Sequence, residues 1–191
     1  GSGNYGRAFH LAGAREWGGE LQDDLTDATR WAIAQGIADP KRICIYGASY
    51  GGYAALMGAA KEPDLYRCAA GYVGVYNLEK MHRDDARSAR RMMHWANDWL
   101  GDRKDMAAVS PTELAHRIKI PVFLAAGGKD KRAPVEHTEQ MEQALKKVGV
   151  PVESLYFPHE GHVFYNEEHK REFYTKLLAF LSRHLGGATA K

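Results

Sequence analysis

The sequence has no long apolar run and little net charge. No uninterrupted hydrophobic stretch approaches the roughly 20 residues that a membrane-spanning helix needs. Lys and Arg number 26 against 24 for Asp and Glu, which leaves a formal net charge of +2. A nearly neutral chain has no electrostatic reason to bind nucleic acid or an anionic membrane. We therefore expect neither as a partner.

Cysteine is also scarce. Cys44 and Cys68 are the only two, and both lie in apolar runs without the C-x-x-C spacing of a metal or redox site. Buried free thiols are the expected state of both residues. The sequence predicts no cofactor and no metal ion.

The 191 residues, 45% of them hydrophobic, are enough for one domain with a substantial core. Apolar runs without polar alternation are typical of parallel strands covered on both faces. Such runs alternate here with helical patterns, which predicts an α/β fold with a parallel sheet and helices on both faces over residues 1–191. The expected strands are 41–46, 68–75, 120–126 and 152–157, and the expected helices are 19–35, 50–60, 135–148 and 167–184.

Four segments carry further expectations. In helix 19–35 the apolar stripe of Leu21, Leu25, Ala28 and Ala32 is expected to pack on the sheet. Residues 77–105 mix basic, Met and Trp residues and are expected to form a helical excursion over the site, with some side chains in the core or facing a substrate pocket. The segment 1–6 spells G-x-G-x-x-G, but without a preceding strand it is expected to be a loop. Residues 186–191 are expected to fray.

The chain is organised around Gly47-Ala48-Ser49-Tyr50-Gly51, a G-x-S-x-G pattern. A β-rich run precedes it and a small-residue helical run follows it. This strand, turn and helix order is the context in which the motif exposes a nucleophilic serine. Ser49 is therefore the candidate nucleophile.

A serine hydroxyl needs a base to take its proton and an acid to orient that base. Asp130 and His162 each follow a predicted strand, and with Ser49 they come in the chain order Ser, Asp, His. His159 competes with His162, but Gly161 and the greater distance from the strand favour His162. The segment from His159 to His162 lacks the H-E-x-x-H spacing of a zinc site.

These motifs, G-A-S-Y-G-G-Y-A at Ser49, G-x-x-D-x-R-x-P at Asp130 and P-H-E-G-H at His162, resemble the catalytic domain of the prolyl oligopeptidase family of serine peptidases. The resemblance extends over essentially the whole chain and is greatest to the dipeptidyl and acylaminoacyl peptidase branch. It implies an α/β-hydrolase fold and an enzyme that cleaves peptides through an acyl-enzyme intermediate.

The resemblance also implies roles for other residues. The backbone N–H of Tyr50 would be one oxyanion donor. Arg132 would bind the carbonyl or carboxyl end of the substrate, although it could also be a solvated cation. Val75, Tyr76 and Leu78 fall where the family lines its specificity pocket. The chain departs from the family at Val163, where glycine is common, and at Asn77, where aspartate is common.

Only one helix and a glycine-rich loop precede the strand of Ser49, so the first strands of an α/β-hydrolase sheet have no counterpart here. The loop that supplies the second oxyanion donor has no counterpart either. We therefore expect a C-terminal portion of a larger enzyme, whose open sheet edge is covered by the missing N-terminal segment or by another copy. Two other functions stay open, a carboxylesterase and a non-catalytic interaction module that retains the fold.

Overall fold

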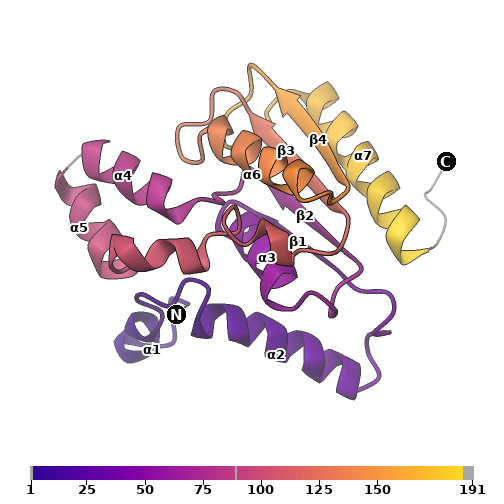
Figure 1. Ribbon diagram of the computed structural model, residues 1–191, viewed down its shortest axis with the longest axis horizontal. Coiled ribbons are helices and arrows are strands. Elements are labelled where there is room, and N and C mark those ends of the chain that lie inside the picture. The colour runs from indigo at the N-terminus through magenta and orange to yellow at the C-terminus, as the bar shows by residue number, and fades with distance from the viewer. Residues whose placement is uncertain (1, 89, 187–191) are drawn as a thin grey trace.

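The computed structural model describes residues 2–88 and 90–186, together with their side chains except those of residues 85–93. Four parallel strands form one sheet in the order β1-β2-β3-β4 (Figure 1). The strands are β1 (Cys44–Ala48), β2 (Cys68–Tyr72), β3 (Val122–Gly127) and β4 (Val152–Phe157). All four coincide with the expected strands to within a few residues.

The helices connect these strands. They are α1 (Arg7–Ala12), α2 (Glu20–Ala34), α3 (Tyr50–Lys61), α4 (Leu78–Ser88), α5 (Arg90–Trp99), α6 (Val135–Lys147) and α7 (Glu167–Leu185), with short 3₁₀ helices at Arg103–Val109 and Ala115–Arg117. Among the described helices, α1 and the short 3₁₀ helix Ala115–Arg117 were not expected, and the segment 2–6 before α1 forms turns and a bend. Of the tail expected to fray, residues 187–191 lie outside the described residues.

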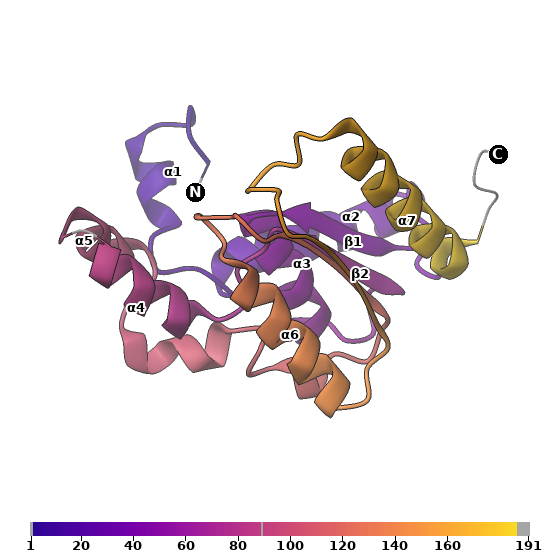
Figure 2. The ribbon, with the colours of Figure 1, turned by 90° about the horizontal axis from the view of Figure 1, so that it is seen from above.

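Alternate residues of β3 pack on opposite faces of the sheet. Val122 and Leu124 belong to the core beneath α3 and α6, whereas Phe123 and Ala125 belong to the core beneath α7. Every residue of β3 is buried, which explains why the strand lacks polar alternation. Figure 2 shows the three layers, with α7 on one side of the sheet and α3 and α6 on the other.

The apolar stripe predicted for α2 does not face the core. The residues that α2 buries are Gln22 and Thr26, whereas Leu25 remains 39% exposed. Gln22 is turned toward α3 at Gly58, where an added Cβ would lie 3.0 Å from the Gln22 amide nitrogen. The prediction was wrong because α2 lies beyond α3 at the margin of the sheet (Figure 1). It therefore packs against the outer side of α3 and not against the sheet itself.

The prediction of free thiols is also wrong. Cys44 on β1 and Cys68 on β2 are partners in the parallel register, with their Cα atoms 4.7 Å apart, and they form a disulfide. This separation is within the usual range for a disulfide. The two residues are 24 positions apart in the sequence, and only the strand register brings them side by side.

The segment between β2 and β3 leaves the sheet as α4 and α5 and lies beside α1 at one end of the molecule (Figure 2). Met81 and Trp95 pack against the core cluster that contains Tyr53. The side chains of Met92 and Met93, which the sequence suggested for the core, lie outside the described ones. Within residues 2–88 and 90–186, no helix is long and apolar enough to cross a membrane.

Candidate active site

Ser49 occupies a strained turn between β1 and α3. Its φ of 57° and ψ of −119° lie outside the regions that residues with a side chain usually adopt. Gly47 is required there because a Cβ would collide with the backbone of Gly51. The Ser49 N–H donates to the carbonyl oxygen of Tyr72 at 2.9 Å, which ties the turn to the end of β2.

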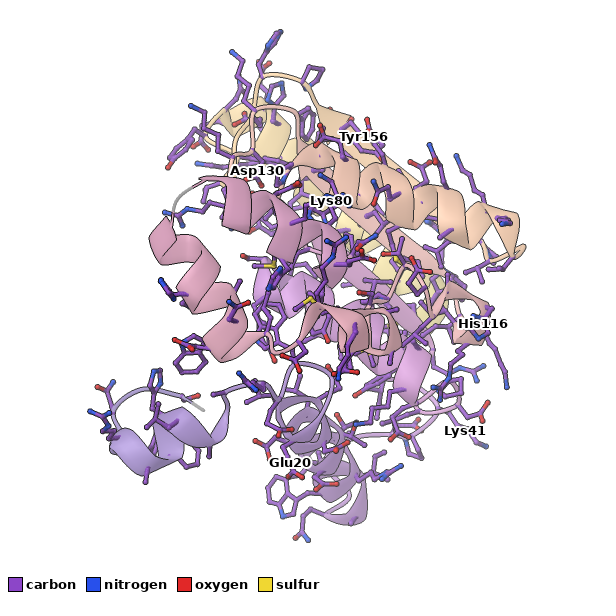
Figure 3. The ribbon with its side chains drawn as sticks, turned by 60° about the vertical axis from the view of Figure 1, so that its left-hand side comes forward. Glu20, Lys41, Lys80, His116, Asp130 and Tyr156 are labelled. Carbon is purple, nitrogen blue, oxygen red and sulfur yellow. A yellow bond between two sulfur atoms is a disulfide. The ribbon has the colours of Figure 1, made fainter. Side chains whose placement is uncertain are left out.

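His162 contacts two groups that are far away in the sequence. Its Nε2 atom lies 2.9 Å from Oγ of Ser49, and its Nδ1 atom lies 2.8 Å from Oδ2 of Asp130. Asp130 follows the carboxyl end of β3, and in Figure 3 it lies toward the upper left, whereas Lys41, which precedes β1, lies at the lower right. The structure thus brings together the three residues that the chain order predicted.

The orientation of Asp130 is held by the backbone of its own loop. Its Oδ1 atom accepts from the N–H of Arg132 at 2.8 Å and from that of Ala133 at 2.9 Å. Only Oδ2 is left for His162. Because a carboxylate accepts and cannot donate, Nδ1 of His162 carries the proton, and Nε2 is free to accept the Ser49 hydroxyl proton.

The competitor His159 is exposed, whereas His162 is partly buried. The departure at Val163 leaves this geometry intact. Positive φ occurs among the described non-glycine residues at Asn4, Arg15, Ser49 and Val73, so Val163 has an ordinary backbone conformation. Its side chain is 50% exposed and therefore does not need the space that a glycine would leave.

Tyr50 is the first residue of α3. The N–H groups of a first helical turn have no partner inside the helix and carry partial positive charge. The Tyr50 N–H therefore has the donor character that an oxyanion site requires. Arg132 has an exposed side chain, and its backbone N–H is one of the two donors that hold Asp130.

The three residues suggested for the specificity pocket lie inside the protein. Val75 is 5% exposed, and Tyr76 and Leu78 are fully buried. Val75 and Leu78 pack in the cluster that contacts Tyr50, and Tyr76 belongs to the core beneath α3 and α6. The expectation that these side chains face a substrate is not supported by this burial, because they are needed to fill the core behind the turn.

Asn77 performs the capping function for which aspartate would also be suited. Its Oδ1 atom accepts from the N–H of Lys80 at 2.9 Å, at the start of α4. The neighbouring N–H groups of Tyr76 and Asn77 lie 3.3 and 3.4 Å from Nδ1 of His137, a buried residue of α6. Burial, followed by the nearby Lys80, lowers the pKa of His137 to about 4, so the ring stays neutral and accepts.

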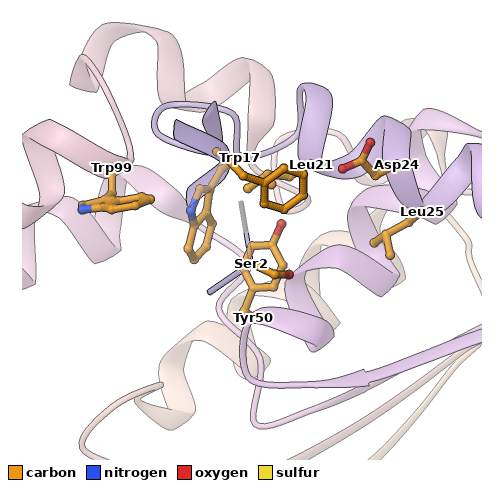
Figure 4. Close-up of a pocket in the computed structure, with 9 residues that line it drawn as sticks. Ser2, Trp17, Leu21, Asp24, Leu25, Tyr50 and Trp99 are labelled. Atoms are coloured by element: carbon orange, nitrogen blue, oxygen red, sulfur yellow. The ribbon is translucent and has the colours of Figure 1, made fainter. Parts of the chain in front are cut away.

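A cavity of about 400 Å³ lies beside Tyr50 (Figure 4). The rings of Trp17 and Tyr50 meet edge to face in its wall, with centroids 4.6 Å apart. Asp24 supplies a carboxylate, and burial, followed by this charge, raises the pKa of Tyr50. The lining residues are Ser2, Phe9, Gly13, Trp17, Leu21, Asp24, Leu25, Tyr50 and Trp99.

Sequence reasoning missed several residues that support the site, above all Tyr72, His137 and Glu160. Glu160 lies within the P-H-E-G-H motif and could have been suspected from it. Tyr72 and His137 have no local signal, because their contacts are with residues far along the chain. Among the described residues, no His, Cys, Asp and Glu side chains form a group of three that could hold a metal ion.

Comparison with known proteins identifies relatives over the whole chain. The model of the prolyl oligopeptidase family matches residues 1–188. Dipeptidyl aminopeptidase BIII from Pseudoxanthomonas mexicana is 34% identical over 199 residues, which cover 98% of this chain and 28% of that protein. An acylamino-acid-releasing enzyme from Arabidopsis thaliana is 30% identical over 158 residues, which cover 73% of this chain and 19% of that protein.

Solved structures agree with the sequence matches. A puromycin-hydrolyzing peptidase from Mycobacterium tuberculosis superposes with a TM-score of 0.89 at 28% sequence identity, over 98% of this chain and 28% of that one. The four-stranded sheet and its helices thus have the α/β-hydrolase fold of this neighbour. The chain spans less than a third of the length of the proteins that it matches.

Proposed function

The chain belongs to the prolyl oligopeptidase family, and from this premise we propose that it carries the catalytic residues of a serine peptidase. The enzyme hydrolyses short peptides, as a dipeptidyl or acylaminoacyl peptidase does, through an acyl-enzyme. The observation that supports this most strongly is His162, whose ring nitrogens lie 2.9 Å from Ser49 Oγ and 2.8 Å from Asp130 Oδ2.

In this mechanism Ser49 is the nucleophile. Nε2 of His162 takes the hydroxyl proton as Oγ attacks the substrate carbonyl, and it then gives that proton to the leaving amine. Asp130 keeps the imidazole in the tautomer with its proton on Nδ1 and stabilises the positive charge that forms. Water repeats the sequence to release the acyl group, with His162 again as the base.

The oxyanion that forms on the substrate requires donors. We assign the Tyr50 N–H as one of them, because it lies at the N-terminus of α3 directly after Ser49. Removal of one such donor costs roughly 3 kcal/mol of transition-state stabilisation in comparable sites. The exposed side chain of Arg132 is our candidate for binding the carbonyl or carboxyl end of the substrate.

The test of this function is labelling with a fluorophosphonate, which reacts with activated serines. It is carried out on the longer polypeptide that we propose contains this chain, referred to below as the full-length enzyme. Labelling should occur in the wild type and in Ser182→Ala, a control on α7, and should be absent in Ser49→Ala. A full-length enzyme that does not label, or that still labels after Ser49→Ala, would contradict the proposal.

A carboxylesterase with the same catalytic residues would also label. The two activities are separated by comparing kcat/KM for peptide p-nitroanilides and p-nitrophenyl esters. A peptidase cleaves a blocked or free dipeptidyl anilide as well as the more reactive ester, and loses both activities in Ser49→Ala. Turnover of esters alone would show that the enzyme is a carboxylesterase and not a peptidase. The roles proposed for Ser49, Asp130 and His162 would not change.

We also propose that the free edge of β1 is covered by a preceding segment of the same polypeptide. In the described part of the chain β1 has a strand partner only at β2. Beyond it, a hollow of about 390 Å³ is lined by apolar side chains of α2 and of the start of β1, among them Leu25, Ala32 and Ile45. Relatives more than three times as long support a segment of the same chain as the occupant. A second copy is the alternative outcome.

A further inference from the structure

His162 lies in an irregular segment between β4 and α7, residues 158–166, which we call the histidine loop. Pro158, His159, Val163 and Tyr165 are exposed in it, so much of the loop lacks support from core packing. A base must nevertheless be held close to its productive position, since a misplacement of about 1 Å can reduce the rate roughly a hundredfold. Two side chains anchor this loop, those of Tyr72 and Glu160.

The first anchor is Tyr72, at the carboxyl end of β2. Its hydroxyl oxygen accepts from the N–H of Phe164, two residues beyond His162, at 2.9 Å. Its ring packs edge to face against Phe164, with centroids 4.7 Å apart. The carbonyl oxygen of the same residue accepts from the N–H of Ser49 at 2.9 Å. Tyr72 therefore holds the nucleophile through its backbone and the histidine loop through its side chain.

The second anchor is Glu160, which is 5% exposed. Its carboxylate accepts from the N–H of Tyr165 at 2.8 Å, from that of Asn166 at 3.0 Å and from Nδ1 of His169 at 2.7 Å. Its own carbonyl oxygen accepts from the N–H of Lys129 at 2.8 Å, next to Asp130. Glu160 thus closes the histidine loop on itself and ties it to the loop of Asp130.

The charge of Glu160 matches this arrangement. Burial acts to raise the pKa of the carboxyl group, but the N–H of Tyr165, the His169 side chain and the N–H of Asn166 outweigh it and lower the pKa. The group therefore stays ionised and can accept from all three donors. The ring of His169 is itself stacked on Phe157, the last residue of β4, with centroids 4.3 Å apart.

From these contacts we propose that Tyr72 and Glu160 are positioning residues for the reaction. They hold the loop so that Nε2 of His162 faces Oγ of Ser49 while Nδ1 faces Asp130. Neither side chain touches the reacting atoms, and both side chains act through His162. The inference rests on the proposed function, because it concerns the same reaction.

The decisive variant is Tyr72→Phe in the full-length enzyme, which removes one oxygen atom and keeps the ring. The matched control is Tyr165→Phe, which removes the same atom from a side chain of the same loop that is 77% exposed. Turnover is expressed per active site titrated with fluorophosphonate, so that unfolded molecules do not count. We expect kcat to fall roughly tenfold in Tyr72→Phe with KM unchanged, and to stay at the wild-type value in Tyr165→Phe.

A second pair tests the other anchor. Glu160→Gln keeps the shape of the side chain but presents an amide NH₂ group to donors, and Glu168→Gln makes the same change at an exposed position. Glu160→Gln should lower kcat per titrated site at constant KM, and Glu168→Gln should not.

The outcomes distinguish a failure of the positioning role from a failure of the proposed function. Wild-type kcat per titrated site in both Tyr72→Phe and Glu160→Gln would overturn the positioning role and leave the proposed function intact. A change confined to KM would also overturn it, because a substrate-binding role would then explain the result. A wild-type enzyme that neither labels nor hydrolyses would overturn the proposed function, and this inference with it.

Discussion

Asp130 shows how the backbone determines the protonation state of a neighbouring side chain. Two backbone N–H groups, those of Arg132 and Ala133, occupy its Oδ1 atom. These donors are part of the loop itself and remain in any variant at position 130. The atom that faces His162 must therefore be whichever one the backbone does not bind.

This arrangement makes a prediction for Asp130→Asn. The amide oxygen will take the two backbone donors, so the NH₂ group will face Nδ1 of His162. Nδ1 must then accept, the proton moves to Nε2, and Nε2 can no longer take the proton of Ser49. We expect kcat to fall by about 10⁴-fold, as in other triads that are held in the wrong tautomer. The measurement is turnover per titrated site of the full-length enzyme.

The matched control is Asp64→Asn, at a side chain that is 90% exposed. It should leave kcat unchanged. A loss of less than tenfold in Asp130→Asn would show that Asp130 does not select the tautomer of His162.

His137 predicts a pH dependence of stability. Burial, followed by Lys80, lowers its folded-state pKa from 6.5 to about 4, against smaller opposing effects of Asp84, Glu136 and Asp130. Above pH 6.5 the ring is neutral in both states. As the pH falls from 6.5 toward 4, the unfolded chain takes up a proton that the folded one does not, and stability decreases by up to about 3 kcal/mol.

Urea unfolding of the wild type and of His137→Gln over this pH range measures the effect. The variant keeps an acceptor for the N–H groups of Tyr76 and Asn77 but does not titrate, so its midpoint should depend less on pH. The control His116→Gln, at an exposed residue, should keep the wild-type dependence. Equal slopes in wild type and His137→Gln would contradict the assignment.

At the scale of elements, α2 differs from an ordinary amphipathic helix. Its buried side carries Gln22 and Thr26, whose side-chain polar atoms have no hydrogen-bond partner among the described residues. Its apolar side borders the hollow beside β1. The polar face of α2 thus points toward the core of this chain, and its apolar face points away from it. This orientation is expected if another segment covers the apolar face.

Thr26→Val tests the state of the buried face. It replaces an unpaired hydroxyl by a methyl group of similar size and should raise the free energy of unfolding by about 1 kcal/mol, because an unsatisfied buried group is removed. Thr29→Val on the same helix is the counterpart. Thr29 Oγ1 donates to the Leu25 carbonyl at 2.9 Å and contacts the Tyr66 hydroxyl at 3.2 Å, so this variant should lose about 1 kcal/mol. If both variants gained stability, or both lost it, the difference between an unpaired Thr26 hydroxyl and a paired Thr29 hydroxyl would be refuted.

At the scale of the whole molecule, the free edge of β1 and the apolar face of α2 predict the behaviour of the isolated chain. Unpaired strand edges and exposed apolar surface favour association. Leu25 is 39% exposed, Trp31 60% and Tyr46 44%. We expect the isolated chain to associate and to turn over peptides poorly, since one oxyanion donor has no candidate in it.

Size-exclusion chromatography with light scattering, combined with turnover per titrated site, measures both properties. The full-length enzyme is the control and should be active without this association. A monodisperse monomer of the 21.3 kDa chain with the full peptidase turnover would contradict both expectations.

Much of the fold and of the candidate site could be predicted because the signals are local. The turn at Ser49 is specified by its own glycines, and β4 was predicted at Val152–Phe157, the bounds that the structure has. The order of Ser49, Asp130 and His162 along the chain predicted which residues meet. Each of these signals depends on neighbouring residues or on the rule that parallel strands end at one edge of the sheet.

Sequence by itself thus determined the class of fold, the family and which three residues, Ser49, Asp130 and His162, lie together. Only the tertiary structure decided that Cys44 bonds Cys68, that α2 buries Gln22 instead of Leu25, and that Tyr72 and Glu160 hold the loop of His162. The physical reason is distance along the chain. The partners of Cys44 and Tyr72 are 24 and 92 residues away, and strand register and helix packing, which no local pattern encodes, bring them together.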